Sequence, residues 1–242
     1  MAPDAQEKIS IVAGGGSGIG QACARRLAKM GYRVILVGRT EAKLNATAEE
    51  IARAGGHASV FAADVRDWER LGELQALVAD EGVDLLINCA GGQFVSPSNA
   101  LSRNGWQAVI DVNLSGSFFL CRQLYPALLK RKGSAVMVVA NIWQRPAPGL
   151  AHSAAARAGV VNLTRTLALE WAGDGIRVNA VSPGVTDTPA LRNYPDSDAV
   201  TASVPLGRIG SVEEVVDAIL FMGLAPYVTG EVLTIDGGLH LR

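Results

Sequence analysis

Short apolar runs alternate regularly with longer amphipathic stretches along this sequence, and this pattern restricts the folds open to the chain. The apolar runs, rich in β-branched residues, lie at residues 8–12, 33–37, 59–62, 84–88, 134–140, 177–181 and 231–235. Apolar residues recur with helical spacing at residues 17–30, 40–53, 67–80, 106–130, 151–172 and 211–223. Strands that are apolar throughout and alternate with helices are typical of a parallel sheet covered by helices on both faces. The pattern therefore predicts an α/β protein with a doubly wound parallel sheet.

Composition limits the chain to one domain and removes several classes of partner. The 242 residues are 49% hydrophobic and 19% charged, and no linker or low-complexity stretch divides them, so we expect a single domain over residues 1–242. The net charge of -1 gives no basic surface for nucleic acid, and no apolar run is long enough to span a membrane. The three cysteines lack metal-type spacing, so no metal site is expected. With no signal-peptide pattern at the N-terminus, these reduced thiols predict a cytoplasmic protein.

A glycine-rich loop, Ala13-Gly-Gly-Gly-Ser-Gly-Ile-Gly20, directly follows the first apolar run. Its glycines fit the spacing G-x-x-x-G-x-G at Gly14, Gly18 and Gly20. Such a loop turns sharply, lets a pyrophosphate approach the backbone and presents free N–H groups at a helix N-terminus, whereas a plain flexible turn would need none of this. Its position between a buried strand and a helix predicts a Rossmann-type dinucleotide site. The expected contacts in this loop are Gly14, Gly16, Ser17, Gly18, Ile19 and Gly20.

The end of the second apolar run indicates which dinucleotide binds. NAD-binding folds usually place an acidic residue there for the ribose 2′-hydroxyl, but this chain has Val37-Gly38-Arg39-Thr40. An arginine is unfavourable at the positive end of a helix dipole unless an anion arrives there. Arg39 and Thr40 therefore predict a clamp for a 2′-phosphate and favour NADP(H) as the cofactor.

Together these motifs resemble the short-chain dehydrogenase/reductase family over nearly the whole chain. Besides the glycine loop, the similar segments are Asp64-Val65, Asn88-Cys-Ala-Gly91, Asn113, Ser182-Pro-Gly184 and Ile235-Asp-Gly-Gly238. The resemblance implies that Asp64 and Val65 flank the adenine. It also implies that Asn88, Ala90 and Gly91 line the cofactor cleft, and that the nicotinamide is bordered by Pro183, Gly184, Val185, Thr186 and Thr188.

The sequence departs from this family at the catalytic residues. The usual active site holds a serine and a Tyr-x-x-x-Lys pair that face the substrate from one side of a helix. Alignment on Ala158-Gly-Val160 puts Ser153 at the tyrosine position and Arg157 at the lysine position, so only Asn113 keeps its residue type. A serine hydroxyl beside a permanently charged arginine cannot relay a proton as a phenol does. We expect Asn113, Ser153 and Arg157 to line the active site, with Arg157 also holding the nicotinamide ribose.

Three functions remain open at this point. The first is NADPH-dependent reduction of the C2=C3 double bond of a 2-enoyl thioester, in which charge develops on the thioester oxygen and needs hydrogen-bond donors more than a strong acid. The segments around Gly91-Gly-Gln-Phe-Val-Ser-Pro97 and His152-Ser-Ala-Ala-Ala-Arg-Ala-Gly159 support it, because they resemble the peroxisomal trans-2-enoyl-CoA reductases and the similar 2,4-dienoyl-CoA reductases. The second is a carbonyl reductase or alcohol dehydrogenase whose acid has moved, with His152 or Tyr194 as candidates. The third is a non-catalytic NADP-binding protein.

Two further expectations concern the substrate entrance and assembly. Residues 186–206 contain three prolines between a strand and a helix, which predicts a substrate lid. The run at residues 228–235 is a candidate edge strand, and the resemblance implies a homotetramer built partly on that edge. The expected substrate is a small acyl thioester, most simply a CoA ester, with neither nucleic acid nor membrane as a partner.

Overall fold

Seven parallel strands form the centre of the molecule in the computed structural model, which describes residues 7–189, 191 and 201–242. Their order in the sheet is β3-β2-β1-β4-β5-β6-β7. The chain starts in the middle of the sheet, builds outward to β3, returns to the middle and then builds outward in the other direction. The doubly wound architecture expected from the sequence is therefore confirmed. The strands are β1 (Lys8–Ala13), β2 (Tyr32–Gly38), β3 (His57–Ala62), β4 (Leu85–Asn88), β5 (Ser134–Val138), β6 (Arg177–Pro183) and β7 (Val232–Ile235).

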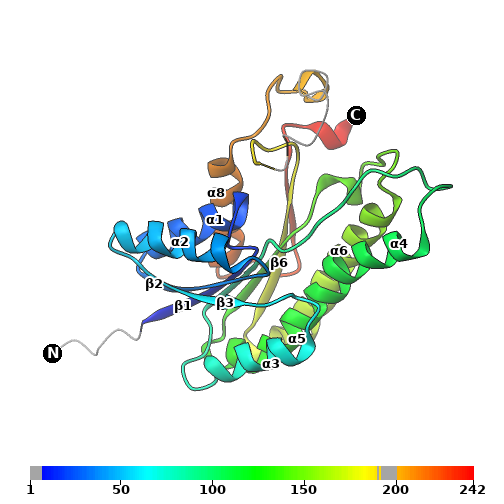
Figure 1. Ribbon diagram of the computed structural model, residues 1–242. Coiled ribbons are helices and arrows are strands. Elements are labelled where there is room, and N and C mark those ends of the chain that lie inside the picture. The colour runs from blue at the N-terminus through cyan, green and yellow to red at the C-terminus, as the bar shows by residue number, and fades with distance from the viewer. Residues whose placement is uncertain (1–6, 190, 192–200) are drawn as a thin grey trace.

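Helices cover both faces of the sheet, as Figure 1 shows. One layer contains α1 (Gly18–Lys29), α2 (Glu41–Arg53) and α8 (Val212–Leu224). The opposite layer contains α3 (Trp68–Leu77), α5 (Gly116–Arg131) and α6 (Ala151–Trp171), with α4 (Arg103–Ile110) packed against α6. Short helical turns are η1 (Asp111–Ser115), η2 (Asn141–Trp143), η3 (Ala172–Asp174) and η5 (Leu239–Leu241).

Burial on both faces explains why the strands read as continuous apolar runs. Along β1, Ile9 and Ile11 pack into the core shared with α3, α5 and α6, whereas Val12 packs into the core shared with α1, α2 and α8. All three side chains are fully buried. Because both faces of the strand are covered, most of its positions are apolar and the alternation typical of half-exposed strands is absent; the polar side chain between Ile9 and Ile11, Ser10, is also fully buried.

The helical region expected at residues 106–130 is divided into two helices. Between α4 and α5 the backbone forms one turn of π-helix, η1, which contains Asn113. A π turn inserts one extra residue into the helical ladder and rotates the side chains that follow it. Apolar spacing does not reveal such an insertion, because the residues on either side keep their helical periodicity.

Among the described residues, no helix has both the length and the apolar character needed to cross a bilayer.

Candidate functional site

A cleft of about 400 Å³ opens at the carboxyl ends of the strands, where the direction of chain winding reverses between β1 and β4. Ligands of doubly wound folds bind at this reversal because the loops from neighbouring strands diverge there. The cleft is bordered by the glycine loop, the ends of β2 and β4, and Thr188-Pro189. The position expected for the cofactor site is therefore hollow.

The glycine loop is held tightly against its neighbours. Gly14 has φ of 79°, a conformation that disfavours a side chain, and its amide donates to the carbonyl oxygen of Val37 at 2.8 Å. A Cβ at Gly14 would lie 2.9 Å from the carbonyl carbon of Cys89, and one at Gly20 would lie 2.3 Å from the oxygen of Gly14. Only hydrogen fits at these two positions, so the backbone itself forms the floor of the cleft.

The N-terminus of α1 is open for an anion. Its N-cap residue, Ser17, makes no side-chain capping hydrogen bond, and the first turn carries no acidic residue. The first amides of a helix have no partner within the helix and carry a partial positive charge. The glycine loop and these amides together fit the pyrophosphate of a nicotinamide dinucleotide.

Basic side chains gather at the far end of the cleft, beyond β2. Arg39, Thr40 and Lys43 line this end, and the side chains of all three residues are exposed. Arg39 forms no hydrogen bond with any residue in the described part of the chain, so its guanidinium is available to a ligand. Sequence reasoning missed Lys43, although its place two residues into α2 beside Arg39 was a readable signal.

Asp64 is committed to a neighbouring arginine. Its carboxylate accepts from Nε and Nη2 of Arg66 at 3.0 and 2.7 Å and from the Arg66 amide at 3.0 Å. These hydrogen bonds hold the pKa of Asp64 below its ordinary value, and the positive charge of Arg39 adds to the effect. Asp64 therefore lines the cleft with its charge already balanced by Arg66. Arg39 and Lys43 are thus left to bind an anion.

Asn113 is fully buried and joins the π turn to the loop after β4. Its amide nitrogen donates to the carbonyl oxygens of Gly92 and Val109, both at 2.8 Å, and its Oδ1 accepts from the Gly92 amide at 3.2 Å. With both ends of the amide engaged, Asn113 fixes the backbone beside the active site.

Ser153 is also fully buried, in the first turn of α6. Its hydroxyl donates to Oε1 of Gln93 at 2.6 Å. Gln93 lies in the loop after β4, so this contact joins two segments sixty residues apart. Sequence reasoning used Gln93 only as part of a resemblance and did not place it beside Ser153, because only the tertiary structure brings the two loops together.

His152 has little freedom to transfer a proton. The ring is completely buried, and its Nδ1 accepts from the backbone N–H of Ser153 at 2.9 Å. The other ring nitrogen, Nε2, is buried and has no partner among the described residues. The ring meets Phe94 edge to face with centroids 4.7 Å apart. Tyr194, the other candidate for a moved acid, lies outside the described residues.

Arg157 places a positive charge behind the cleft wall, against Gly91 and Asn113. Its Nη1 donates to the carbonyl oxygen of Val138 at 2.9 Å, and its Nε is shielded from solvent with no partner in the described chain. A Cβ at Gly91 would lie 2.7 Å from Nη2 of Arg157 and equally close to Oδ1 of Asn113. Burial lowers the pKa of Arg157 to about 10, so the group stays charged at neutral pH. The unpartnered Nε suits a ribose hydroxyl.

The described cleft contains thirteen of the residues expected to bind the cofactor: Gly14, Gly16, Ser17, Gly18, Ile19, Gly20, Arg39, Thr40, Asp64, Val65, Ala90, Gly91 and Thr188. The remaining expected residues lie behind or beside it: Asn88, Arg157, Pro183, Gly184, Val185 and Thr186. Asn88 is buried and donates to Ser117 Oγ at 2.9 Å, so it supports the cleft from below. Gly184 packs against Asp236, where a Cβ would lie 2.5 Å from the Cβ of that residue. The expected lid at residues 186–206 is described only at its two ends, and its centre lies outside the described residues.

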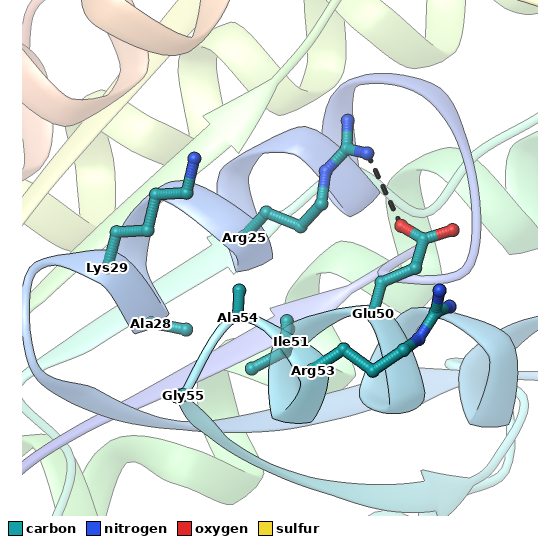
Figure 2. Close-up of a pocket in the computed structure, with 9 residues that line it drawn as sticks. Arg25, Ala28, Lys29, Glu50, Ile51, Arg53, Ala54 and Gly55 are labelled. Carbon is teal, nitrogen blue, oxygen red and sulfur yellow. Dashed lines mark hydrogen bonds and ion pairs between the residues drawn. The ribbon is translucent and has the colours of Figure 1, made fainter.

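A second hollow, of about 600 Å³, lies between α1 and α2 (Figure 2). Its basic residues are Arg25, Lys29 and Arg53, and Arg25 pairs with Glu50 at 3.3 Å. Lys29 and Arg53 stand in the last turns of their helices, where positive charge stabilises the negative end of the helix dipole. Because the N-termini of both helices face the cofactor cleft, this hollow lies at the opposite end of the helices and plays no part in the site.

Comparison with known proteins finds relatives over nearly the whole chain. Residues 13–240 match the family model described as enoyl-(acyl carrier protein) reductase. The chain is 38% identical to a Bacillus subtilis protein described as a probable 2,4-dienoyl-CoA reductase, with 98% of each chain covered. It is 35% identical to a peroxisomal 2,4-dienoyl-CoA reductase of Pongo abelii, covering 98% of this chain and 85% of the relative. It is also 36% identical to a 3-oxoacyl-acyl-carrier-protein reductase of Thermotoga maritima, with 96% and 97% covered.

Solved structures share the whole fold. A short chain dehydrogenase from Bacillus anthracis superimposes with a TM-score of 0.91 at 37% identity, covering 98% of both chains. A variant of actinorhodin polyketide ketoreductase, solved with NADPH, superimposes with a TM-score of 0.92 at 33% identity, again over 98% of both chains. A neighbour that carries NADPH and a cleft that fits a dinucleotide both indicate a nicotinamide cofactor. The chain belongs to the short-chain dehydrogenase/reductase family of oxidoreductases, and its relatives include the 2,4-dienoyl-CoA reductases.

Proposed function

We propose that this oxidoreductase reduces the C2=C3 double bond of a 2-enoyl thioester, most simply a CoA ester, with NADPH. One observation supports this reaction above the others. At the position where a reductase of carbonyl groups carries a phenol, the chain has the hydroxyl of Ser153, hydrogen-bonded to Gln93 and followed one turn later by Arg157. No tyrosine lines the described cleft. The site thus offers hydrogen-bond donors and positive charge, but no phenol that could donate a proton.

This arrangement matches what the reduction of a conjugated double bond requires. Hydride from a bound nicotinamide would add to Cβ, negative charge would develop on the thioester oxygen, and Cα would then take a proton from water. The hydroxyl of Ser153 would exchange Gln93 for that oxygen, and the guanidinium of Arg157 would stabilise the charge through space while its Nε holds the cofactor ribose. A carbonyl reduction would instead need a strong proton donor at the new alkoxide, which a serine hydroxyl is not.

Arg39 and Lys43 support NADP(H) over NAD(H). Both are exposed at the end of the cleft where the 2′-position of the adenosine ribose lies in folds of this kind, and the carboxylate that lines the cleft there, Asp64, is paired with Arg66. A planar guanidinium can bind two charged oxygens of a 2′-phosphate at once, whereas a ribose 2′-hydroxyl carries no charge.

The reaction is tested by following NADPH absorbance with a short and a medium 2-enoyl-CoA and with the matching 3-ketoacyl-CoA. We expect turnover of the enoyl esters. Turnover of the 3-ketoacyl-CoA alone would contradict the proposal and would favour the alternative function, a carbonyl reductase whose acid lies at another position. Tight NADPH binding without turnover of any ester would favour a non-catalytic protein.

We also propose that the chain works as a homotetramer in the cytoplasm. Large apolar side chains are exposed on two separate sides: Trp106 and Phe118 on α4 and α5, and Phe221 and Leu224 on α8, beside the edge strand β7. Side chains of this size are usually covered in the working assembly. All three cysteines are free thiols, as expected in a reducing compartment. Light scattering of the purified protein, with Phe221→Lys as the variant that should break one interface, tests the assembly.

A further inference from the structure

The hydroxyl of Ser153 is covered by an exposed glutamine. Ser153 has no exposed surface, whereas Gln93, in the loop after β4, is exposed and accepts the serine proton at Oε1 over 2.6 Å. In this conformation a ligand that arrives from solvent meets the glutamine amide before it meets the hydroxyl. The serine that the proposed reaction uses is therefore reached only after the side chain of Gln93 has moved.

The loop backbone on both sides of Gln93 is held in place. Asn113 accepts from the N–H of Gly92 at 3.2 Å and donates to its carbonyl oxygen at 2.8 Å. Further along the loop, the amide of Ser96 donates to the carbonyl oxygen of Gly149 at 2.9 Å. The glutamine side chain between these two points has several rotatable bonds. Rotation about them uncovers the serine without any shift of the backbone.

Gln93 offers Ser153 the same kind of acceptor that a thioester offers. Both acceptors are carbonyl oxygens, and a serine hydroxyl carries a single proton, so it donates to one of them at a time. We propose that Oε1 of Gln93 occupies the subsite of the substrate's thioester oxygen, so that every bound ester must displace the glutamine. This inference rests on the proposed function and adds to it a residue that sets the affinity for the substrate.

The displacement affects the bound ester and the transition state alike. In both states the contact between Gln93 and Ser153 must break before the hydroxyl turns to the substrate oxygen. An interaction that opposes the two states equally changes KM and leaves kcat unaltered. Gln93 is thus a positioning residue, which holds the Ser153 hydroxyl in place and acts on the reaction through that hydroxyl.

Two replacements of Gln93 should move KM in opposite directions. Leucine has a similar size but offers no acceptor, so in Gln93→Leu the ester has no glutamine oxygen to displace. KM for a 2-enoyl-CoA should fall roughly fivefold, the equivalent of one hydrogen bond of about 1 kcal/mol, and kcat should stay within about twofold of the wild-type value. Glutamate offers a charged and therefore stronger acceptor, so Gln93→Glu should raise KM.

Two controls separate this role from a general effect on the fold. Gln123 lies on α5, and its amide donates to the carbonyl oxygen of Trp68 at 3.0 Å, so Gln123→Leu removes a comparable contact on another element. It should leave KM unchanged. In protein that already carries Ser153→Ala, the change Gln93→Leu should no longer lower KM, because the hydroxyl for which the two oxygens compete is gone.

The same competition is measured without turnover by calorimetric titration of the matching saturated acyl-CoA into the protein with NADP+ bound. The saturated ester keeps the thioester oxygen but has no double bond to reduce. Its Kd should fall roughly fivefold in Gln93→Leu and rise in Gln93→Glu.

The outcomes distinguish this inference from the proposed function. Turnover of the 2-enoyl-CoA with a KM that is unchanged or higher in Gln93→Leu would overturn the inference and leave the proposed function in place. Absence of turnover, with a Kd for the saturated ester that still falls in Gln93→Leu, would do the reverse. A fall in KM that persists in the Ser153→Ala background would also overturn the inference, because Gln93 would then act without the serine. Failure of every variant to bind the saturated ester would overturn both.

Discussion

Replacing Arg157 with methionine should stabilise the protein in the absence of cofactor. The guanidinium is enclosed with one hydrogen bond, from Nη1 to the Val138 carbonyl, and its Nε has no partner in the described chain. Desolvation of this half-buried cation lowers its pKa to about 10, which corresponds to about 3 kcal/mol of unfavourable free energy at pH 7. Loss of the hydrogen bond to Val138 in the variant would lower the free energy of unfolding by about 1 kcal/mol. The net expectation is a gain of roughly 2 kcal/mol for Arg157→Met.

The assay is urea unfolding without cofactor at pH 7 and pH 9. The folded pKa lies below the unfolded one, so the desolvation penalty is complete at any pH below about 10 and disappears only as the pH rises from there towards the pKa of a free guanidinium. The gain should therefore be equal at the two pH values. Saturating NADPH should raise the stability of the wild type by about 3 kcal/mol at a hundred times its Kd. The variant should gain much less, because it lacks the guanidinium that we assign to the ribose.

Arg165→Met on the same helix is the matched control. Arg165 is exposed, so its removal should change the free energy of unfolding by less than about 0.5 kcal/mol. A lower urea midpoint for Arg157→Met, with the control unchanged, would show that the guanidinium stabilises the fold. It would contradict the expectation that its desolvation costs stability.

Four other changes test separate parts of the argument. Arg39→Asp should weaken NADPH binding by about tenfold or more with little effect on NADH, measured by fluorescence titration. Ser153→Ala should lower kcat on a 2-enoyl-CoA by roughly 100-fold and leave the Kd of NADPH unchanged. Gly20→Ala should weaken NADPH by at least about tenfold, because its Cβ meets backbone at 2.3 Å. Asp236→Asn should lose about 2 kcal/mol of stability at pH 7, since the buried carboxylate accepts from the amides of Gly238 and His240 at 3.0 and 2.8 Å.

The controls for these four changes differ. An Arg39→Asp variant that keeps its NADPH affinity would refute the assignment of the cofactor. A loss of NADPH binding in Ser153→Ala would mean that the serine supports the fold of the cleft. Gly173→Ala, where a Cβ would meet nothing within 4 Å, should bind NADPH normally. Burial acts to raise the pKa of Asp236, but hydrogen bonds from His240 and Asn141 outweigh it and lower the pKa overall. The wild type should therefore lose its greater stability over Asp236→Asn as the pH falls below about 4.

Much of the fold was predictable because both faces of the sheet are buried. Each of the seven apolar runs corresponds to a strand, since a strand covered on both sides is apolar at most of its positions. Element boundaries shifted by a few residues, and the one large difference was the π turn at Asn113. That turn is stabilised by contacts to Gly92, a residue twenty-one positions away, which no local pattern contains.

Residue type and spacing were enough to predict the sheet, the glycine loop and the basic end of the cleft, and the resemblance to the family identified Ser153 at the position of the usual tyrosine. Which distant side chains meet depends on the folded chain. Folding brought Gln93 to Ser153 and the guanidinium of Arg157 to the carbonyl of Val138. These pairings join segments from different elements of the fold. Their distances, and the desolvation that sets the charge of each group, follow from packing that a one-dimensional pattern does not encode.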